Sequence, residues 1–113
     1  MDSSKKGQER FEALKRKLLM LGFVRPGSVV RRFVPCGNPS CRCAEKPPRL
    51  HGPYYEWSCK VAGKTRTIRL SQRQAQLCLQ WVGNHKKLKR IVRLMERLSL
   101  KETDRALGAI SHP

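Results

Sequence analysis

The chain has 113 residues, enough for one domain and hardly for two, so a large enzyme is excluded. Its 25 Lys and Arg residues outnumber 8 Asp and Glu residues, and the formal net charge of +17 calls for an anionic partner or counterions. Ile, Leu, Val and Phe number 26, about 23% of the chain, which is close to the roughly 20% associated with disorder. A metal, disulfides or oligomerisation is therefore expected to support the apolar core, and five cysteines are present.

Membrane insertion and secretion find no support in the sequence. The longest apolar run is residues 18–21, far below the eighteen or so residues of a membrane span. The first residues lack the apolar segment and cleavage site of a secretory signal. We therefore expect a cytoplasmic protein with no membrane partner. In that reducing compartment five cysteines indicate free thiols or metal ligands rather than a disulfide framework.

Four apolar residues near the start of the chain recur at helical spacing. They are Phe11, Leu14, Leu18 and Leu21, which are three, four and three residues apart. This spacing predicts an amphipathic helix over residues 8–21, and Gly22 is expected to stop it.

Three short segments after this helix carry strand signals. Residues 28–34 are rich in β-branched side chains and end before Pro35. Residues 36–53 are dense in Pro, Gly and Cys and are expected to form a loop, which is long enough to need something that pins it. Residues 54–61 and 65–70 read as a hairpin joined by Ala62-Gly63-Lys64. The three strands predict a small antiparallel sheet.

A long basic helix is expected to follow the sheet. Ser71 is a good N-cap, and the helix is expected to run to about Ser99, with residues 101–107 either extending it or forming a short second helix. An apolar stripe with Asn84 as its polar interruption consists of Leu77, Trp81, Leu88, Ile91, Met95 and Leu98. Either the stripe packs on the rest of the chain or it forms a seam for self-association.

The predicted fold class is therefore α+β, with a three-stranded antiparallel sheet and a zinc-binding loop flanked by an N-terminal helix and a long C-terminal helix. Three parts are expected: an N-terminal amphipathic helix over 1–26, a zinc loop and sheet over 27–70, and a long basic helix with a tail over 71–113.

The predicted loop carries a cluster of metal-ligand residues. Cys36 and Cys41 are separated by four residues that include Gly and Pro, Cys43 follows, and His51 comes after seven more residues. Three thiolates and an imidazole are a ligand set for a structural Zn²⁺. The alternatives are loop thiols with a hydrogen-bonded histidine, or a redox role. Cys59 and Cys78 are expected in the core, although Cys59 is near enough in sequence to replace His51.

The excess positive charge indicates nucleic-acid binding, because planar guanidinium groups grip phosphates and one-sided charge is the footprint of such proteins. The candidate contact residues are Arg25, Arg31, Arg32, Arg42, Arg49, Tyr54, Tyr55, Lys64, Arg66, Arg69, Lys86, Lys87, Lys89, Arg90 and Arg93. The two tyrosines could stack on unpaired bases, or they could pack in the core. An anionic membrane surface or an acidic protein is the alternative partner.

The motif string resembles a family of short uncharacterised bacterial proteins, zinc-ribbon-like, that are often encoded beside insertion-sequence transposases. The matching segments are Gly27-Ser28, Arg31-Arg32, Cys36-Gly37 with Pro39, Cys41-Arg42-Cys43-Ala44, His51-Gly52-Pro53-Tyr54-Tyr55 and Gly63-Lys64-Thr65-Arg66. The resemblance covers roughly residues 27–98 and leaves the N-terminal helix outside. It implies a mobile-element setting and a single Cys36, Cys41, Cys43 and His51 unit.

No pattern of catalytic residues accompanies these features. Beside His51 the chain has His85 and His112, and its acids are scattered singly rather than paired. We therefore expect a non-enzymatic nucleic-acid-binding module in the bacterial cytoplasm, nucleoid-associated if it binds DNA, with a transposase or nuclease as the candidate protein partner. The alternative is an interaction or oligomerisation adaptor that uses the Leu77 to Leu98 stripe, with a dimer formed through the C-terminal helix.

Overall fold

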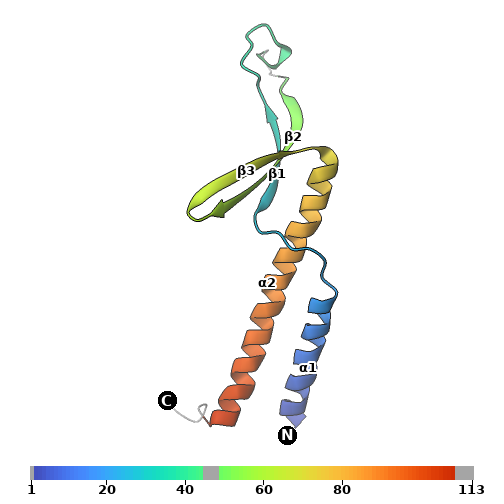
Figure 1. The fold of residues 1–113 in the computed structure, drawn as a ribbon, viewed down its shortest axis with the longest axis vertical. Coiled ribbons are helices and arrows are strands. Elements are labelled where there is room, and N and C mark those ends of the chain that lie inside the picture. Colours follow the sequence, from blue (N-terminus) through green and yellow to red (C-terminus); the bar gives the residue numbers. More distant parts are fainter. Residues whose placement is uncertain (1, 45–48, 109–113) are drawn as a thin grey trace. The chain divides into compact units, whose positions relative to one another are not determined.

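The computed structural model describes residues 2–44 and 49–108. The elements in chain order are helix α1 (Asp2–Leu19), strand β1 (Ser28–Val34), the 3₁₀ turn η1 (Arg42–Ala44), strand β2 (His51–Val61), strand β3 (Lys64–Leu70) and helix α2 (Gln72–Leu107), as Figure 1 shows. The predicted fold class is confirmed: a helix, a three-stranded antiparallel sheet with a Cys/His cluster in its loop, and a long second helix.

The internal contacts of the chain define two compact units. The sheet unit is Arg25–Gly83 and contains the three strands and the beginning of α2. The hairpin unit combines Met1–Val24 with Asn84–Pro113 and contains α1 and the remainder of α2.

The core of the sheet unit lies between one face of the sheet and the first turns of α2. The strand order is β1-β2-β3, and Trp57 on the central strand pairs with Val29 on one side and Ile68 on the other. Trp57 is 3% exposed and packs with the buried Cys78 and Val82 of α2. Partly buried residues around this cluster are Val29, Cys59, Leu70 and Trp81. Alternate residues of β2 therefore face this core, as their two-residue period predicts.

The start of β2 differs from the sequence prediction. β2 begins at His51 rather than at Tyr54, because His51 pairs with Val34 of β1. The register shift between Arg32 and Val34 places two β2 residues, Gly52 and Pro53, opposite one β1 residue. Such a bulge tolerates a proline inside a strand, which explains why a segment with loop composition forms strand.

The β2–β3 turn is one residue shorter than predicted. Ala62 and Gly63 form the turn, and Lys64 already pairs with Val61. Both turn residues have positive φ, 53° and 79°, which is typical of the two-residue turns that match the twist of a hairpin.

The segment before β1 is fixed to the sheet core. The Trp57 Nε1 group donates a hydrogen bond to the Pro26 carbonyl at 2.8 Å, and the Arg25 amide donates to the Trp81 carbonyl at 3.1 Å. The Arg25 guanidinium lies 3.8 Å from the centroid of the Trp57 ring. The backbone approaches the sheet closely at Gly27, whose φ is +109°.

Helix α2 begins as predicted and continues without a break past Ser99. The Gln74 amide donates to Ser71 Oγ at 3.1 Å, and the Ser71 amide donates to Gln74 Oε1 at 2.8 Å, so the two residues form a capping box. Of the two alternatives for residues 101–107, the structure shows the extension: α2 continues to Leu107, with the Thr103 hydroxyl donating to the Ser99 carbonyl at 2.7 Å.

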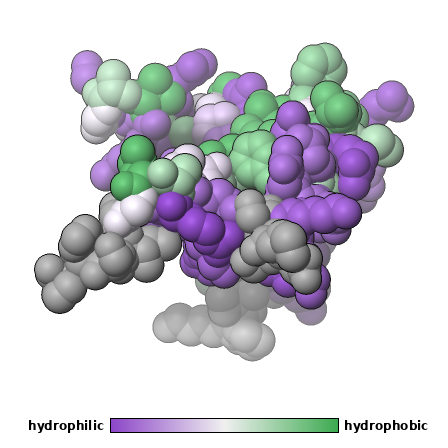
Figure 2. Space-filling view, turned by 90° about the horizontal axis from the view of Figure 1, so that it is seen from below, coloured by the Kyte–Doolittle hydropathy of each residue, from purple (hydrophilic) through white to green (hydrophobic). Residues whose placement is uncertain are grey.

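In the hairpin unit α1 runs antiparallel to the final part of α2 (Figure 1). Leu14 and Ile91 are buried, and the Asn84 side-chain amide donates to the Phe23 carbonyl at 2.8 Å. Helix α1 spans Asp2–Leu19 rather than residues 8–21. It starts earlier because the polar residues before the apolar stripe are helical as well. It ends earlier because hydrogen bonds between residues three apart, typical of a turn, follow Leu19. Figure 2, viewed from the end where both termini lie, shows hydrophilic residues over much of this surface.

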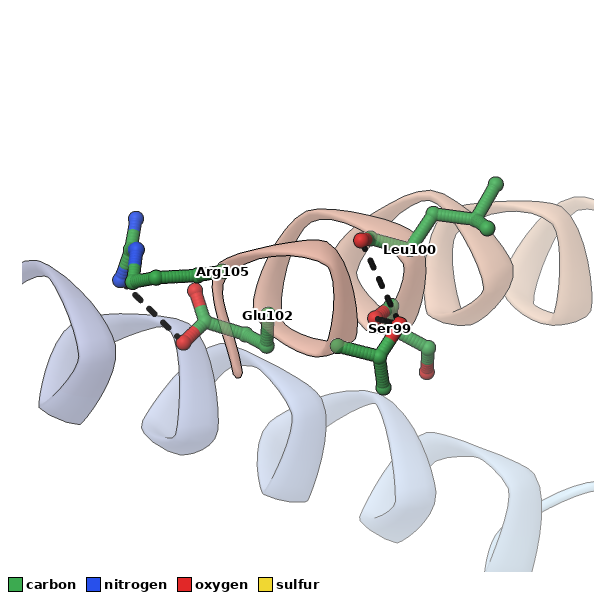
Figure 3. Close-up of polar contacts among 5 residues, drawn as sticks. Ser99, Leu100, Glu102 and Arg105 are labelled. Carbon is green, nitrogen blue, oxygen red and sulfur yellow. Dashed lines mark hydrogen bonds and ion pairs between the residues drawn. The ribbon is translucent and has the colours of Figure 1, made fainter. Parts of the chain in front are cut away.

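The apolar stripe of α2 contributes to packing within the chain. Trp81 packs against the sheet core, and Ile91 is buried in the hairpin unit. Asn84 interrupts the stripe at the point where the chain passes from the sheet unit to the hairpin unit. Near the end of α2, polar side chains pair within the helix, and Arg105 Nη1 lies 3.3 Å from Glu102 Oε1 (Figure 3). Among the described residues no helix combines the length and the apolar character that a membrane crossing demands.

Candidate metal centre and basic surfaces

Four ligand residues meet in the connection between β1 and β2. They are Cys36, Cys41, Cys43 and His51, and their ligand atoms all lie within 4.8 Å of one another. The cysteines lie between the end of β1 and the end of η1, and His51 is the first residue of β2. The pairing of His51 with Val34 closes the loop and brings the imidazole to the thiols. The structure thus brings together the four residues that the sequence spacing indicated.

Local hydrogen bonds shape the loop between the first two cysteines. Asn38 Oδ1 accepts hydrogen bonds from the Ser40 amide at 3.0 Å and the Ser40 hydroxyl at 2.8 Å. The Cys41 amide donates to the Asn38 carbonyl at 3.0 Å, and Gly37 takes a φ of +83°. This turn reverses the chain so that the thiols of Cys36 and Cys41 face the same point. Asn38 was not among the residues for which the sequence indicated a role, although Asn before Pro and Ser is a recognisable turn signal.

The distances in the cluster suit a tetrahedral metal ion. The Sγ atoms of Cys36 and Cys43 are 3.4 Å apart, and Cys41 Sγ is 3.1 Å from His51 Nε2. With metal–sulfur bonds of about 2.3 Å, ligand atoms at the corners of a tetrahedron are separated by about 3.8 Å. These two separations are somewhat shorter than this value, and all four ligand atoms lie within 4.8 Å of one another, so the four residues are positioned to hold one metal ion.

The electrostatics of the three thiols also favour a cation. Hydrogen bonding to the backbone of Asn38, and then to the other two thiols, lowers the pKa of Cys36. Hydrogen bonding to the backbone of Cys43 lowers the pKa of Cys41. A hydrogen bond from the Cys36 amide acts in the same direction on Cys43, but burial and repulsion from the neighbouring sulfurs raise the pKa of Cys43 overall. A bound cation relieves this repulsion and stabilises all three thiolates.

The remaining cysteines lie outside the cluster. Cys78 is buried in the sheet core, and Cys59 packs against that core next to Trp57, as expected for small apolar side chains. The alternative in which Cys59 replaces His51 is therefore wrong, because His51 completes the ligand set. Of the two carboxylates near the loop in sequence, Glu56 pairs with Arg32, and Glu45 lies outside the described residues.

The strand register divides the candidate nucleic-acid contacts of the sheet between its two faces. Arg32 and Tyr54 are register partners, and Arg69 pairs with Glu56, so these residues share the face opposite to the core. On this open face the Arg69 guanidinium lies 4.5 Å from the Tyr54 ring centroid, and Arg32 Nε lies 3.6 Å from Glu56 Oε1. The residues on the core-facing side are Arg31, Tyr55 and Arg66.

Other candidate contacts lie away from this open face. Arg42 and Arg49 are exposed in the metal loop, where the Arg49 amide donates to the Arg42 carbonyl at 3.3 Å. Lys64 follows the turn at the other end of β2, and Arg25 is stacked on the core residue Trp57. The candidates on α2 are exposed members of the hairpin unit: Lys86, Lys87, Lys89, Arg90 and Arg93.

A family model described as a domain of unknown function (DUF6788) matches residues 5–77. The chain belongs to this family. The match includes the metal cluster and the sheet and extends over most of α1, which the motif resemblance had left outside. The family is uncharacterised, as the resemblance implied. No curated protein and no solved structure matches the chain.

Proposed function

We propose that this chain is a zinc-stabilised, non-enzymatic module that binds nucleic acid through the open face of its sheet. The observation that carries the proposal is the grouping of Arg32, Tyr54 and Arg69 on that face. The Arg32 side chain is 59% exposed, and the Arg69 guanidinium already lies over an aromatic ring. Two guanidinium groups beside a tyrosine combine phosphate binding with a surface for base stacking.

Zinc is the metal that the ligand set favours. Three thiolates and one imidazole are soft or borderline ligands, and this combination is common in structural zinc sites. Four protein ligands fill a tetrahedron and leave no coordination position for a substrate. The role of the metal is therefore to hold the loop and the adjoining strand ends in place, which fits a binding module better than an enzyme.

The charge of the chain supports an anionic polymer as the ligand. Eight acidic residues cannot neutralise 25 cations, and residues 23–70 alone carry ten cations and two acids. Nucleic acid is a dense line of phosphates, and binding releases its counterions for each phosphate that a cation neutralises. The motif resemblance supports a bacterial mobile-element setting, in which a transposase or nuclease is the protein partner and the complex is cytoplasmic.

The test is a salt series with duplex DNA, single-stranded DNA and structured RNA, using two matched double variants. Arg32→Ala/Arg69→Ala removes two guanidinium groups from the open face, and Arg31→Ala/Arg66→Ala removes two from the other face. The open-face variant is expected to reduce the logarithmic salt slope on duplex DNA by about one to two, since each phosphate contact contributes about 0.9. The control variant is expected to keep the slope of the unsubstituted chain.

Replacement of Tyr54 separates stacking from charge. Tyr54→Ala is expected to weaken single-strand binding by about 1 to 3 kcal/mol with little change in the salt slope. Circular dichroism and zinc content confirm that each variant is folded. Equal slopes for the two double variants contradict binding at the open face, and absence of binding to all three nucleic acids at about 50 mM salt contradicts the proposed function, because phosphate contacts are strongest at low salt.

A further inference from the structure

Two thiols of the metal cluster, Cys36 and Cys43, lie against each other and differ in their access to solvent. Their Sγ atoms are 3.4 Å apart, and the Cys36 amide also donates a hydrogen bond to Cys43 Sγ at 3.3 Å. Cys36 is exposed, whereas Cys43 is only 3% exposed. An oxidant in solution therefore reaches one sulfur of this thiol pair, and the sulfur beside it is shielded.

The backbone around the thiol pair allows the two sulfurs to bond. A disulfide needs an S–S distance of about 2.0 Å, so the sulfurs have to approach each other by roughly 1.4 Å. Both cysteines lie in the connection between β1 and β2, Cys36 after the end of β1 at Val34 and Cys43 in the short turn η1. The paired residues of the two strands do not include either of them. Closure of the disulfide therefore requires a movement within the connection and breaks no strand pairing.

The other three thiols have different surroundings. Cys41 Sγ lies 3.1 Å from His51 Nε2, so its neighbour is an imidazole that cannot form a disulfide. Cys78 is buried in the core of the sheet unit, and Cys59 packs against the same core. The thiol pair thus combines an exposed sulfur with a second sulfur in contact, which is the arrangement of a cysteine that reacts with an oxidant and a cysteine that resolves the product.

We propose that hydrogen peroxide oxidises the thiol pair to a disulfide and thereby releases the metal, so that the cluster is a reversible redox switch. The Cys36 thiolate attacks the peroxide, the O–O bond breaks, and a sulfenic acid forms with loss of one hydroxide ion. The Cys43 thiolate then attacks that sulfur, the S–O bond breaks, and a second hydroxide ion leaves as the S–S bond forms. The peroxide gains two electrons and each sulfur loses one, so the step is balanced.

Loss of the thiol pair removes half of the ligand set. Structural zinc is held by four ligands, and after oxidation only Cys41 and His51 remain. A disulfide sulfur does not replace a thiolate as a ligand, because the thiolate is the form that binds the metal. An external thiol that attacks the disulfide restores both thiolates and with them the site, so the switch is reversible.

The consequence for nucleic acid rests on the proposed function. His51 pairs with Val34 beyond the bulge, and this single pair holds the end of β2 next to Arg32 and Tyr54 of the open face. Release of the metal removes the link between His51 and the loop thiols. Oxidation is therefore expected to weaken nucleic-acid binding, and reduction in the presence of zinc is expected to restore it.

The test is to add hydrogen peroxide to the zinc-loaded full chain and to measure released zinc with a chromogenic chelator. About one zinc per chain is expected to be released, and dithiothreitol is expected to restore zinc binding. Trypsin cleaves after Arg42 and separates Cys43 from Cys36 and Cys41, so mass spectrometry detects a disulfide to Cys43 as two joined peptides. Peptide fragmentation is expected to assign the bond to Cys36. A chain that keeps its zinc in peroxide overturns the proposal, and so does a disulfide between any other pair.

Two variants locate the reaction. Cys36→His removes the exposed thiol but leaves two thiolates and two imidazoles, which are also a zinc ligand set, so its zinc release is expected to be slower by about tenfold or more. Cys59→Ser changes a thiol outside the cluster and is expected to release zinc at the rate of the unsubstituted chain. Equal rates for Cys36→His and the unsubstituted chain overturn the proposal. If Cys36→His does not load zinc, the disulfide assignment in the unsubstituted chain decides.

Binding of single-stranded DNA before and after oxidation tests the link to function. The affinity is expected to fall by about tenfold or more on oxidation and to recover on reduction with zinc. An unchanged affinity of the oxidised, zinc-free chain overturns the regulatory role. A chain that binds no nucleic acid in either form contradicts the proposed function alone, because zinc release and the disulfide are measured without nucleic acid.

Discussion

Gly27 lies where the backbone passes directly over the sheet core, so alanine at this position is expected to destabilise the sheet unit. A Cβ atom on Gly27 would lie 2.5 Å from the Ser58 carbonyl oxygen and 2.7 Å from Trp57 Nε1. The φ of +109° is also one that L-residues rarely adopt. Neither neighbour can move freely, because Ser58 is part of the central strand and Trp57 is buried.

The expected loss of stability follows from two contributions. A strained backbone conformation costs about 1 to 3 kcal/mol. Relief of the clash requires the backbone to move away from the sheet, which breaks the 2.8 Å hydrogen bond from Trp57 to the Pro26 carbonyl and costs about 1 kcal/mol more. We therefore expect Gly27→Ala to lower the free energy of unfolding by about 2 to 4 kcal/mol, a large part of a typical domain's stability.

A second glycine provides the control. Gly63 also has a positive φ, +79°, but a Cβ atom there would meet nothing within 4 Å. Gly63→Ala therefore carries the backbone cost alone, about 1 to 2 kcal/mol. Urea unfolding of the zinc-loaded protein, monitored by tryptophan fluorescence, measures both variants, since both tryptophans lie in the sheet unit. Equal losses for the two variants would refute the close approach of the chain to the sheet at Gly27.

Three further outcomes are expected. Cys41→Ser is expected to lose the bound zinc, whereas Cys59→Ser keeps one zinc per chain; elemental analysis that finds full zinc in the first variant would contradict the ligand assignment. Zinc affinity is expected to rise with pH, because binding displaces thiol protons. The raised pKa of Cys43 extends this rise toward higher pH. A chelator competition at several pH values that shows the same zinc affinity throughout would contradict this. Ile91→Asp is expected to lower the free energy of unfolding in urea by about 2 to 5 kcal/mol, because Ile91 is only 5% exposed. Lys87→Asp, at an exposed position, is expected to lower it little. Similar losses for the two variants would contradict burial of Ile91 in the core of the hairpin unit.

Local signals explain the parts of the fold that the sequence could predict. β1 has the predicted bounds because a β-branched run ends at a proline, which cannot continue the ladder. Helix α2 begins after Ser71 because the Ser and Gln spacing forms a capping box within four residues. The metal ligands were predictable for the same reason, because three of the four lie within a single turn-forming segment of eight residues, 36–43.

Contacts between distant residues explain what the sequence could not predict. The extra strand residues at the start of β2 depend on the pairing of His51 with Val34, which composition alone does not reveal. Arg25 was a candidate phosphate contact by charge, but it stacks on Trp57, which is 32 residues away in the sequence. Neighbouring residues of a strand such as Arg31 and Arg32 lie on opposite faces, but only the register of the sheet shows which of the two faces the core.

The metal centre and the sheet depend on each other through His51. This residue is both a ligand in the cluster and the partner of Val34 in the last pair between β1 and β2. A bulge separates this pair from the regular ladder that begins at Arg32 and Tyr54, so backbone pairing holds the strand end weakly. A metal ion held by His51 and Cys36 would link the two strand ends beyond the bulge and so stabilise the register that places Arg32 beside Tyr54. Zinc therefore contributes to nucleic-acid binding in our proposal by ordering the open face, without touching the ligand itself.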